Sequence, residues 1–189
     1  MDHFIEMEYL KKDFTKGAFQ PALYENCVFV DCNFEGVDLS DSKFHECIFK
    51  NSNLSNAKLL NVQFQGIEFS QCKLLGLYFN DCKQMLLEFN FRNCKLSHSS
   101  FYQMRLDKTK FIQCELEGVD FEETNLSMAV FEQCSLQDAR FGGADLRDAN
   151  FKTSYGISIH PEEVKLKGAI FSNSNIAGLL IHTQIIIED

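Results

Sequence analysis

Eight cysteines give this 189-residue chain its widest range of possible chemistry. Thiols can pair as disulfides, bind zinc or act as nucleophiles. A structural zinc site favours two cysteines separated by two residues, and the sequence has no such pair. The intervals are multiples of five, except the one between the fifth and sixth cysteines: Cys27, Cys32, Cys47, Cys72, Cys82, Cys94, Cys114 and Cys134. This spacing favours a structural role over a metal or redox site.

Histidine and serine form no catalytic pattern. No histidine has a partner at metal-ligand spacing: they are His3, His45, His98, His160 and His182. The serines lack the G-x-S-x-G nucleophile elbow, and no glycine-rich phosphate loop is present. We therefore expect no enzyme, no metal and no cofactor. The segment Thr153–Lys165 is the one stretch where a site could be hidden.

Carboxylates are the third group with possible chemistry. The chain has 27 acidic and 18 basic residues, a formal charge of −9, which argues against direct nucleic-acid binding. One reading of the acids is a solvated face that keeps the protein soluble. The other is a partner-binding patch that enters a basic groove. The patch residues would be Glu115, Glu117, Asp120, Glu122, Glu123, Asp138, Asp145 and Asp148.

A five-residue repeat must position all of these groups. A large apolar residue, here called a centre, recurs at every fifth position from Phe29 to Phe79 and again from Leu86 to Phe151. The residue two before each centre is mostly small, and every cysteine occupies that position (Cys82 precedes the would-be centre Gln84). A period of five suits neither an α-helix nor a flat strand. The cleanest copies lie in ADLRDANF, residues 144–151.

These residues resemble the pentapeptide-repeat family, whose motif is small–Asp/Asn–Leu/Phe–polar–Gly or polar. The resemblance extends over residues 14–176. It implies an all-β fold, a right-handed quadrilateral parallel β-helix in which four pentapeptides make one coil. We expect about seven coils, completed by a short C-terminal helix and strand that act as a cap.

The alternation of centres supports a four-sided coil independently of the resemblance. Phe and Leu alternate from Leu86 to Phe151, so Phe recurs every ten residues, half a turn of a twenty-residue coil. Phe91 and Phe111 should therefore stack in one column, with Phe101 and Phe121 in the opposite column. Cysteines are expected as buried, inward-facing filler. Stacked thiols such as Cys94 and Cys114 would be ~4.8 Å apart, more than the ~3.8 Å that a disulfide needs between Cβ atoms.

The repeat is interrupted at two places. In CKQMLLEFNF the phase slips by two residues, leaving Gln84 at an expected centre and Phe89 at a small position. We expect a bulge that re-aims the rod; the alternative is a bend or hinge for a partner. The second interruption, residues 153–168, is expected as a loop or short helix, beginning at Pro161.

The ends of the chain are predicted to act as caps. We assign residues 1–13 to an N-terminal cap, 14–152 to coils and 169–189 to the last coil with its cap, all in one domain. A short helix over Ile176–Ile181 and a strand over Gln184–Glu188 should close the last coil. The resemblance also implies a homodimer through the C-terminus, formed by Ile176, Leu179, Leu180, Ile181, Ile185 and Ile187. The competing account is that the cap consumes these aliphatic residues and leaves a monomer.

Together these features predict a non-catalytic protein-interaction rod. The chain has no signal-peptide pattern and no apolar run long enough to span a membrane, so a cytoplasmic location is expected. Some members of the resembled family mimic DNA and bind DNA gyrase, which makes gyrase the candidate partner. Seven coils would span ~34 Å, where duplex DNA carries about 20 charges, more than twice the charge of −9 here. The repeats also lack the long projecting loops of quinolone-resistance members. The alternative function is a structural scaffold or self-assembly module.

Overall fold

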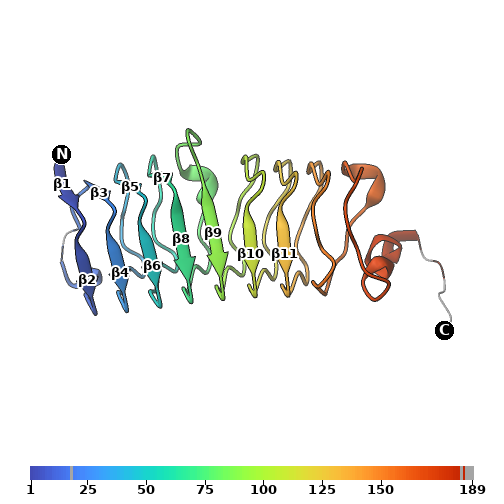
Figure 1. Ribbon diagram of the computed structural model, residues 1–189, viewed down its shortest axis with the longest axis horizontal. Helices are drawn as coiled ribbons and strands as arrows, with labels where there is room; N and C mark the ends of the chain where they lie inside the picture. The colour runs from blue at the N-terminus through green and yellow to red at the C-terminus, as the bar shows by residue number, and fades with distance from the viewer. Residues whose placement is uncertain (18, 184, 186–189) are drawn as a thin grey trace.

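The computed structural model describes residues 1–17, 19–183 and 185 as one straight, four-sided rod with the chain termini at opposite ends (Figure 1). Successive coils stack along the rod, and every strand pair is parallel. The described residues contain no α-helix and only five short 3-10 turns. The predicted quadrilateral parallel β-helix is therefore confirmed.

Strands form on two of the four sides. Side 1 is a seven-stranded sheet in the order β11-β10-β9-β8-β6-β4-β2. Its strands are β2 (Glu8–Leu10), β4 (Val28–Val30), β6 (Ile48–Lys50), β8 (Ile67–Ser70), β9 (Phe89–Arg92), β10 (Lys110–Ile112) and β11 (Val130–Glu132). Side 4 carries the four-stranded sheet β1-β3-β5-β7. These strands are β1 (Asp2–Ile5), β3 (Ala22–Glu25), β5 (Lys43–His45) and β7 (Gln63–Gln65).

The remaining two sides are held by single parallel bridges between coils. Side 2 contains the bridge between Lys95 and Glu115, and side 3 the bridge between Ser100 and Asp120. The 3-10 turns are η1 (Phe14–Lys16), η2 (Phe79–Asp81), η3 (Pro161–Glu163), η4 (Ile176–Leu179) and η5 (Ile181–Thr183). The chain thus passes sides 1, 2, 3 and 4 in order and returns one coil further along.

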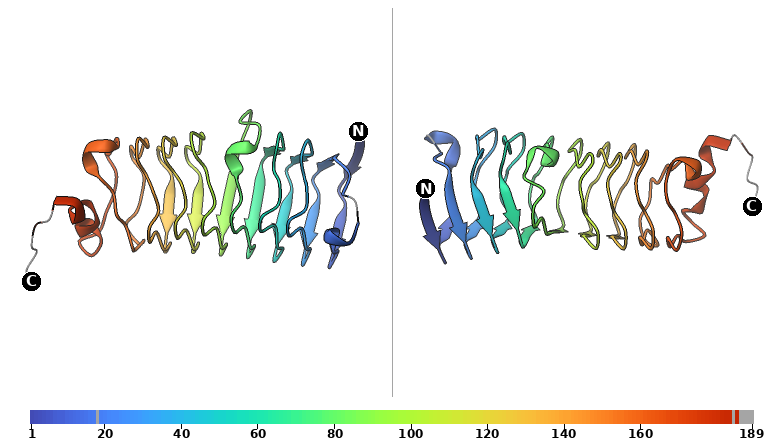
Figure 2. Two further views of the ribbon diagram at one scale, coloured as in Figure 1. Left: turned by 180° about the vertical axis from the view of Figure 1, so that it is seen from behind. Right: turned by 90° about the horizontal axis from the view of Figure 1, so that it is seen from above.

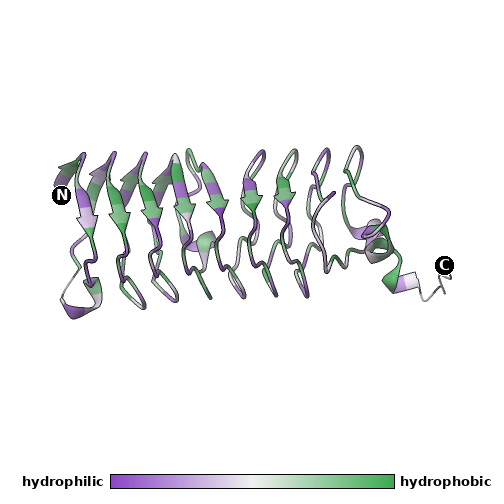
Figure 3. Cartoon of the chain, turned by 60° about the horizontal axis from the view of Figure 1, so that its bottom comes forward, coloured by the Kyte–Doolittle hydropathy of each residue, from purple (hydrophilic) through white to green (hydrophobic). Residues whose placement is uncertain are grey.

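The centres fill the interior in columns, as the repeat predicts. On side 1, Phe91 and Phe111 stack with ring centroids 5.1 Å apart, and on side 3, Phe101 and Phe121 stack at 5.4 Å. All four are at most 1% exposed. Apolar and polar residues alternate along each side (Figure 3), because neighbouring residues of an extended segment face opposite ways.

Corners between sides explain the polar or glycine position two residues after each centre. Asn56 and Gly76, stacked at one corner, have φ of 56° and 63°. This left-handed conformation is least strained for Gly, and Asn tolerates it better than most residues. The sharp turn at each corner therefore selects that part of the repeat.

The cysteines are inward-facing and free, and they do more than fill space. All eight are buried. The thiol of Cys72 points to the carbonyl oxygen of Phe49 in the preceding coil at 3.2 Å, and Cys134 points to that of Phe111 at 3.3 Å. Ser154 donates to Phe131 in the same way at 2.8 Å. The small position therefore also supplies weak or strong donors to buried carbonyl groups.

The register slip produces a projecting loop and no change in the direction of the rod (Figure 1, Figure 2). Sheet pairing continues through it, with Phe69 opposite Phe91. Gln84 is exposed, Met85 and Leu86 are 72% and 68% exposed, and Phe89 is 1% exposed. The expectations of a re-aimed rod and of a centre at Leu86 are wrong. A buried Gln would lack partners, so the chain leaves the wall and Phe89 fills the vacated space.

The N-terminal segment differs from the expected cap. Residues 2–10 form β1 and β2, which pair in parallel with β3 and β4 and make the first coil. The reason is that Phe4 and Tyr9 continue the five-residue spacing backwards, stacking on Tyr24 and Phe29 at 5.3 and 4.8 Å. No described residue covers the outer faces of these two rings.

The C-terminal end is closed by its own chain. The predicted helix is two 3-10 turns, η4 and η5, while η3 occupies the segment predicted as a loop or short helix. The amide of Asn175 donates to the carbonyl oxygens of Phe151 and Ser154 at 2.7 and 3.0 Å. Leu179 packs against the core. Of the predicted strand, all but Ile185 lies outside the described residues, and Ile185 is not in a strand.

Candidate interaction surface

The filled interior places any function on the outer sides or at the ends of the rod. Three outward positions per side, one before and two after each centre, repeat along the rod. Among the described residues, no helix could cross a membrane and no cluster of metal-ligating side chains is found. The sides differ mainly in charge.

Side 3 is the most acidic of the four sides. It carries eight described acids against two bases, Lys58 and Arg140. The acids come from both halves of the chain: Asp38, Asp41, Asp81, Asp120, Glu122, Glu123, Glu162 and Glu163. They line one side of the rod for most of its length.

The structure divides the eight predicted patch residues among three sides. Glu115, Glu117 and Asp138 lie on side 2, and Asp120, Glu122 and Glu123 lie on the adjacent side 3. Asp145 and Asp148 lie on side 4, opposite side 2. The five acids between residues 115 and 123 do share one coil, but all eight residues cannot face one flat partner.

Neighbouring cations neutralise part of this patch. Arg140 Nη2 lies 2.8 Å from Asp120, its Nε lies 3.5 Å from Glu122, and Lys95 Nζ lies 2.8 Å from Glu115. Among the described residues, no such pair involves Glu117, Glu123, Asp138 or Asp148. The residual negative charge is therefore spread along side 3 and the edge of side 2.

On side 4, Asp145 belongs to a local ion-pair network. Arg147 lies 2.6 Å from it and Lys165 lies 3.8 Å away. The side-chain hydrogen bond from Arg147 lowers the pKa of Asp145. Asp145 is thus charged but compensated, and it adds little to any acidic surface.

Sequence reasoning missed the acids of the first half, although a signal for them exists. One corner of side 3 reads Asp41, Asn61, Asp81, Gln103, Glu123, Gly143 and Glu163 from coil to coil. An acid occupies every second coil, a spacing of about 10 Å. The intervals between these acids are 40, 42 and 40 residues, so the column becomes visible only when the two slipped residues are counted.

A Ser–His pair also escaped the sequence analysis. Ser158 Oγ lies 3.0 Å from His182 Nε2, and the His160 ring stacks on His182. They line a hollow of about 330 Å³ together with Glu122, Arg140 and Glu163. Within the described residues, no carboxylate hydrogen-bonds to either ring, so nothing orients the imidazole as a catalytic triad requires. The sequence separation of 24 between Ser158 and His182 hid this pairing.

The aliphatic residues of the C-terminal end fall into two groups. Ile176, Ile181 and Ile185 are 43%, 59% and 55% exposed, while Leu179 and Leu180 are half-buried. Ile187 lies outside the described residues. The cap therefore consumes some of the predicted set and leaves the others on the surface.

Comparison with known proteins agrees with this architecture. The family described as "Pentapeptide repeat region" matches residues 84–155, and the "SV2A/B/C luminal domain" family matches residues 3–74. No curated protein matches the chain. HetL, a pentapeptide repeat protein involved in heterocyst differentiation regulation from the cyanobacterium Nostoc sp. strain PCC 7120, has a similar fold. The two are 16% identical, with 91% of this chain and 86% of HetL covered and a TM-score of 0.57.

A second solved structure is a trypsin-treated form of QnrB1, a plasmid-mediated fluoroquinolone resistance protein. It is 21% identical, with 98% of this chain and 100% of that chain covered and a TM-score of 0.47. Residues 84–155 match the pentapeptide-repeat family, and the five-residue pattern and the four-sided solenoid extend this likeness along the chain, which is therefore distantly related to that family.

Proposed function

We propose that this protein is a non-catalytic interaction rod that binds a protein partner through the acidic side 3. The observation that supports the proposal is the alignment of eight acids along that side, two of them paired with Arg140 and one with Lys58. The β-helix scaffold holds these carboxylates at fixed spacing, so no conformational entropy of the backbone is lost on binding. A rigid acidic strip is complementary to an extended basic groove.

The charge density of side 3 is well below that of DNA. From Asp41 to Glu163 the strip spans six coil steps, about 29 Å, where duplex DNA carries about 17 charges. The strip carries a net charge of −6 from eight acids and two bases. It can steer the rod to a basic surface, but shape and contacts from uncharged side chains must supply much of the affinity.

DNA gyrase is the first partner to test, because the pentapeptide-repeat resemblance implies members that bind it. The experiment measures binding of purified protein to gyrase at low and high salt, followed by a supercoiling assay. In the test variant, the side 3 residues Asp41, Asp81 and Glu123 are replaced by Lys.

A matched control tests the role of side 3 independently of net charge. It replaces Asp31, Glu46 and Asp148 by Lys, three exposed corner acids on other sides of the rod. Both variants change the net charge equally. Slower association for the side 3 variant alone supports the proposal. Absence of wild-type binding at low salt rejects gyrase, and equal losses in both variants reject side 3.

A scaffold that assembles with itself is the second candidate function. The specific observation in its favour is the uncovered first coil, whose rings and strand edges resemble the inside of the rod. This candidate predicts self-association without gyrase binding.

A further inference from the structure

We propose that the N-terminal end of the rod pairs with the same end of a second copy, through antiparallel pairing of β2 with β2 of the partner. This contact goes beyond the proposed acidic interaction surface and does not depend on it. It also differs from the C-terminal dimer predicted from the sequence.

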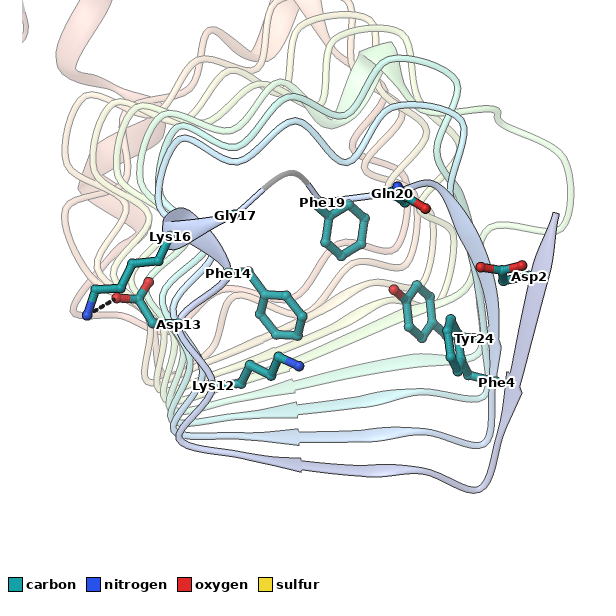
Figure 4. A pocket seen from close by; sticks show the side chains of 10 residues that line it. All are labelled: Asp2, Phe4, Lys12, Asp13, Phe14, Lys16, Gly17, Phe19, Gln20 and Tyr24. Carbon is teal, nitrogen blue, oxygen red and sulfur yellow. Dashed lines mark ion pairs between the residues drawn. The ribbon is translucent and has the colours of Figure 1, made fainter.

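The end of the rod is an unfinished core. Four aromatic rings, one on each side, stand in the first coil: Phe4, Tyr9, Phe14 and Phe19. Each is only half-buried, whereas the rings one coil further in are at most 5% exposed. Phe4, Phe14 and Phe19 border a hollow of about 410 Å³ at the rod's end (Figure 4). The ammonium group of Lys12 lies over the Phe14 ring, 5.6 Å from its centroid.

The strand edges at this end are also open. β1 and β2 are the outermost strands of their sheets. Met7 accepts from the backbone N–H of Val28, and Lys11 donates to the carbonyl of Val30, so both turn toward the next coil. Because backbone groups alternate along a strand, Glu8 and Leu10 turn theirs to the open end. An unpaired edge of this kind is a template for another strand.

Charge around the end makes it complementary to itself. Asp2, Glu6 and Glu8 lie on side 4 and the first half of side 1. Lys11, Lys12 and Lys16 lie at the end of side 1 and on side 2; Asp13, bound to Lys16 at 3.0 Å, is the exception. One half of the rim is therefore acidic and the other half basic.

A two-fold axis perpendicular to the rod, passing through the middles of sides 1 and 3 at this end, would bring the open rings, the open strand edge and the opposite charges of two copies into contact. It maps side 1 onto itself with the strand direction reversed and exchanges sides 2 and 4. Glu8 then opposes Leu10 of the second copy, so the open backbone groups of both residues pair in the antiparallel pattern. Glu6 meets the Lys11–Lys12 corner, and Phe4 covers Phe14 of the second copy. A closed two-fold contact of this kind is the commonest arrangement in homo-oligomers.

The test is a charge exchange measured by light scattering or sedimentation at micromolar concentration. Wild type is expected at twice 21.7 kDa. Glu6→Lys or Lys11→Glu alone places like charges together twice per dimer and should raise the dissociation constant at least about tenfold. An equimolar mixture of the two variants restores both opposite-charge contacts and should recover the dimer. The exposed corner residues Glu46 and Lys108 in the middle of the rod serve as matched controls, as Glu46→Lys and Lys108→Glu.

Several outcomes would overturn the proposal. These are a monomeric wild type, a dimer that survives both single variants, or a mixture that stays monomeric. A dimer abolished by Ile181→Glu would instead place the two-fold contact at the C-terminus. A monomer that binds an extended peptide through β2 would assign the open edge to a peptide and overturn the pairing.

Discussion

The ring centroid of Phe89 lies 5.6 Å from that of Phe64, in the core space that the exposed Gln84 does not fill. Phe89 comes from a position that elsewhere holds a small residue, and it also contacts Phe79 at 5.5 Å. One large residue at a small position therefore compensates for a polar residue at a large one. Between them, Gln84, Met85 and Leu86 are exposed and project from the coil, while Leu87 packs against the core again.

The first prediction concerns this compensation. Phe89→Ala should lower the free energy of unfolding by about 3–5 kcal/mol, because the stacked coils cannot collapse around the cavity. Met85→Ala, at a 72% exposed position in the same loop, should change it by less than about 0.5 kcal/mol. Chemical denaturation of both variants makes the comparison. Similar values for the two variants would mean that Phe89 does not complete the core.

The sequence predicts the regular coils well because the large apolar residue at every fifth position shows which residues of each side face the core. With Phe at every tenth residue and twenty residues to a coil, each Phe stacks on the Phe one coil away, as Phe91 does on Phe111. The slip could not be predicted in the same way. Leu86 keeps the five-residue spacing to Phe91 and so reads as a centre, yet its φ of 62° and its exposure place it in the loop. The five-residue periodicity shows that two residues are inserted, but it does not show which residues of the segment project from the coil as a loop.

The first coil and the acidic strip were missed for related reasons. Phe4 and Tyr9 stand at the correct spacing, but the small and polar positions around them depart from the motif. The acids of side 3 share no local pattern, because Asp41 and Glu123 are 82 residues apart. Their common side depends on the path of the chain around the slip. Local spacing therefore predicts the core. The residues that share a surface patch can be found only by counting all residues of the intervening coils, including the two extra residues of the slip.

The second prediction concerns the C-terminal cap. Asn175 is 8% exposed; its amide donates to two carbonyl groups, and its Oδ1 accepts from the N–H of Ser172 at 2.8 Å. Asn175→Ala should cost about 2–4 kcal/mol, since buried polar groups lose their partners. Hydrogen exchange should show faster exchange at Ser172. Asn173→Ala, at an exposed position, is the control and should be nearly neutral. Unchanged exchange at Ser172 would contradict the capping role.

The third prediction concerns the reactivity of the thiols. Burial raises the pKa of Cys32, Cys47 and Cys82. A thiol reagent attacks the thiolate, so both low access and a raised pKa slow the reaction. Native protein should react slowly at pH 8, and all eight thiols should react at once after denaturation. Rapid labelling of any cysteine in the native protein would show that the coil around it opens.

The last prediction follows from the same burial and concerns stability at high pH. Burial raises the pKa of Cys47 from an ordinary 9.0 to about 12. Between these values the unfolded thiol loses its proton and the folded one keeps it, so ionisation favours the unfolded state. The stabilisation is therefore complete below pH 9 and is lost progressively as the pH rises toward 12.

Between pH 8 and pH 10, wild type should lose about 1.4 kcal/mol more unfolding free energy than Cys47→Ala. Cys47→Ala also loses the thiol contact to the carbonyl of Tyr24 and some packing, but this cost does not change with pH. Ser52→Ala is the matched control, because Ser52 is 1% exposed and bonds to the carbonyl of Phe29 without titrating. Its unfolding free energy should fall in parallel with that of wild type. Parallel curves for wild type and Cys47→Ala would show that Cys47 ionises equally easily in both states and would contradict its burial.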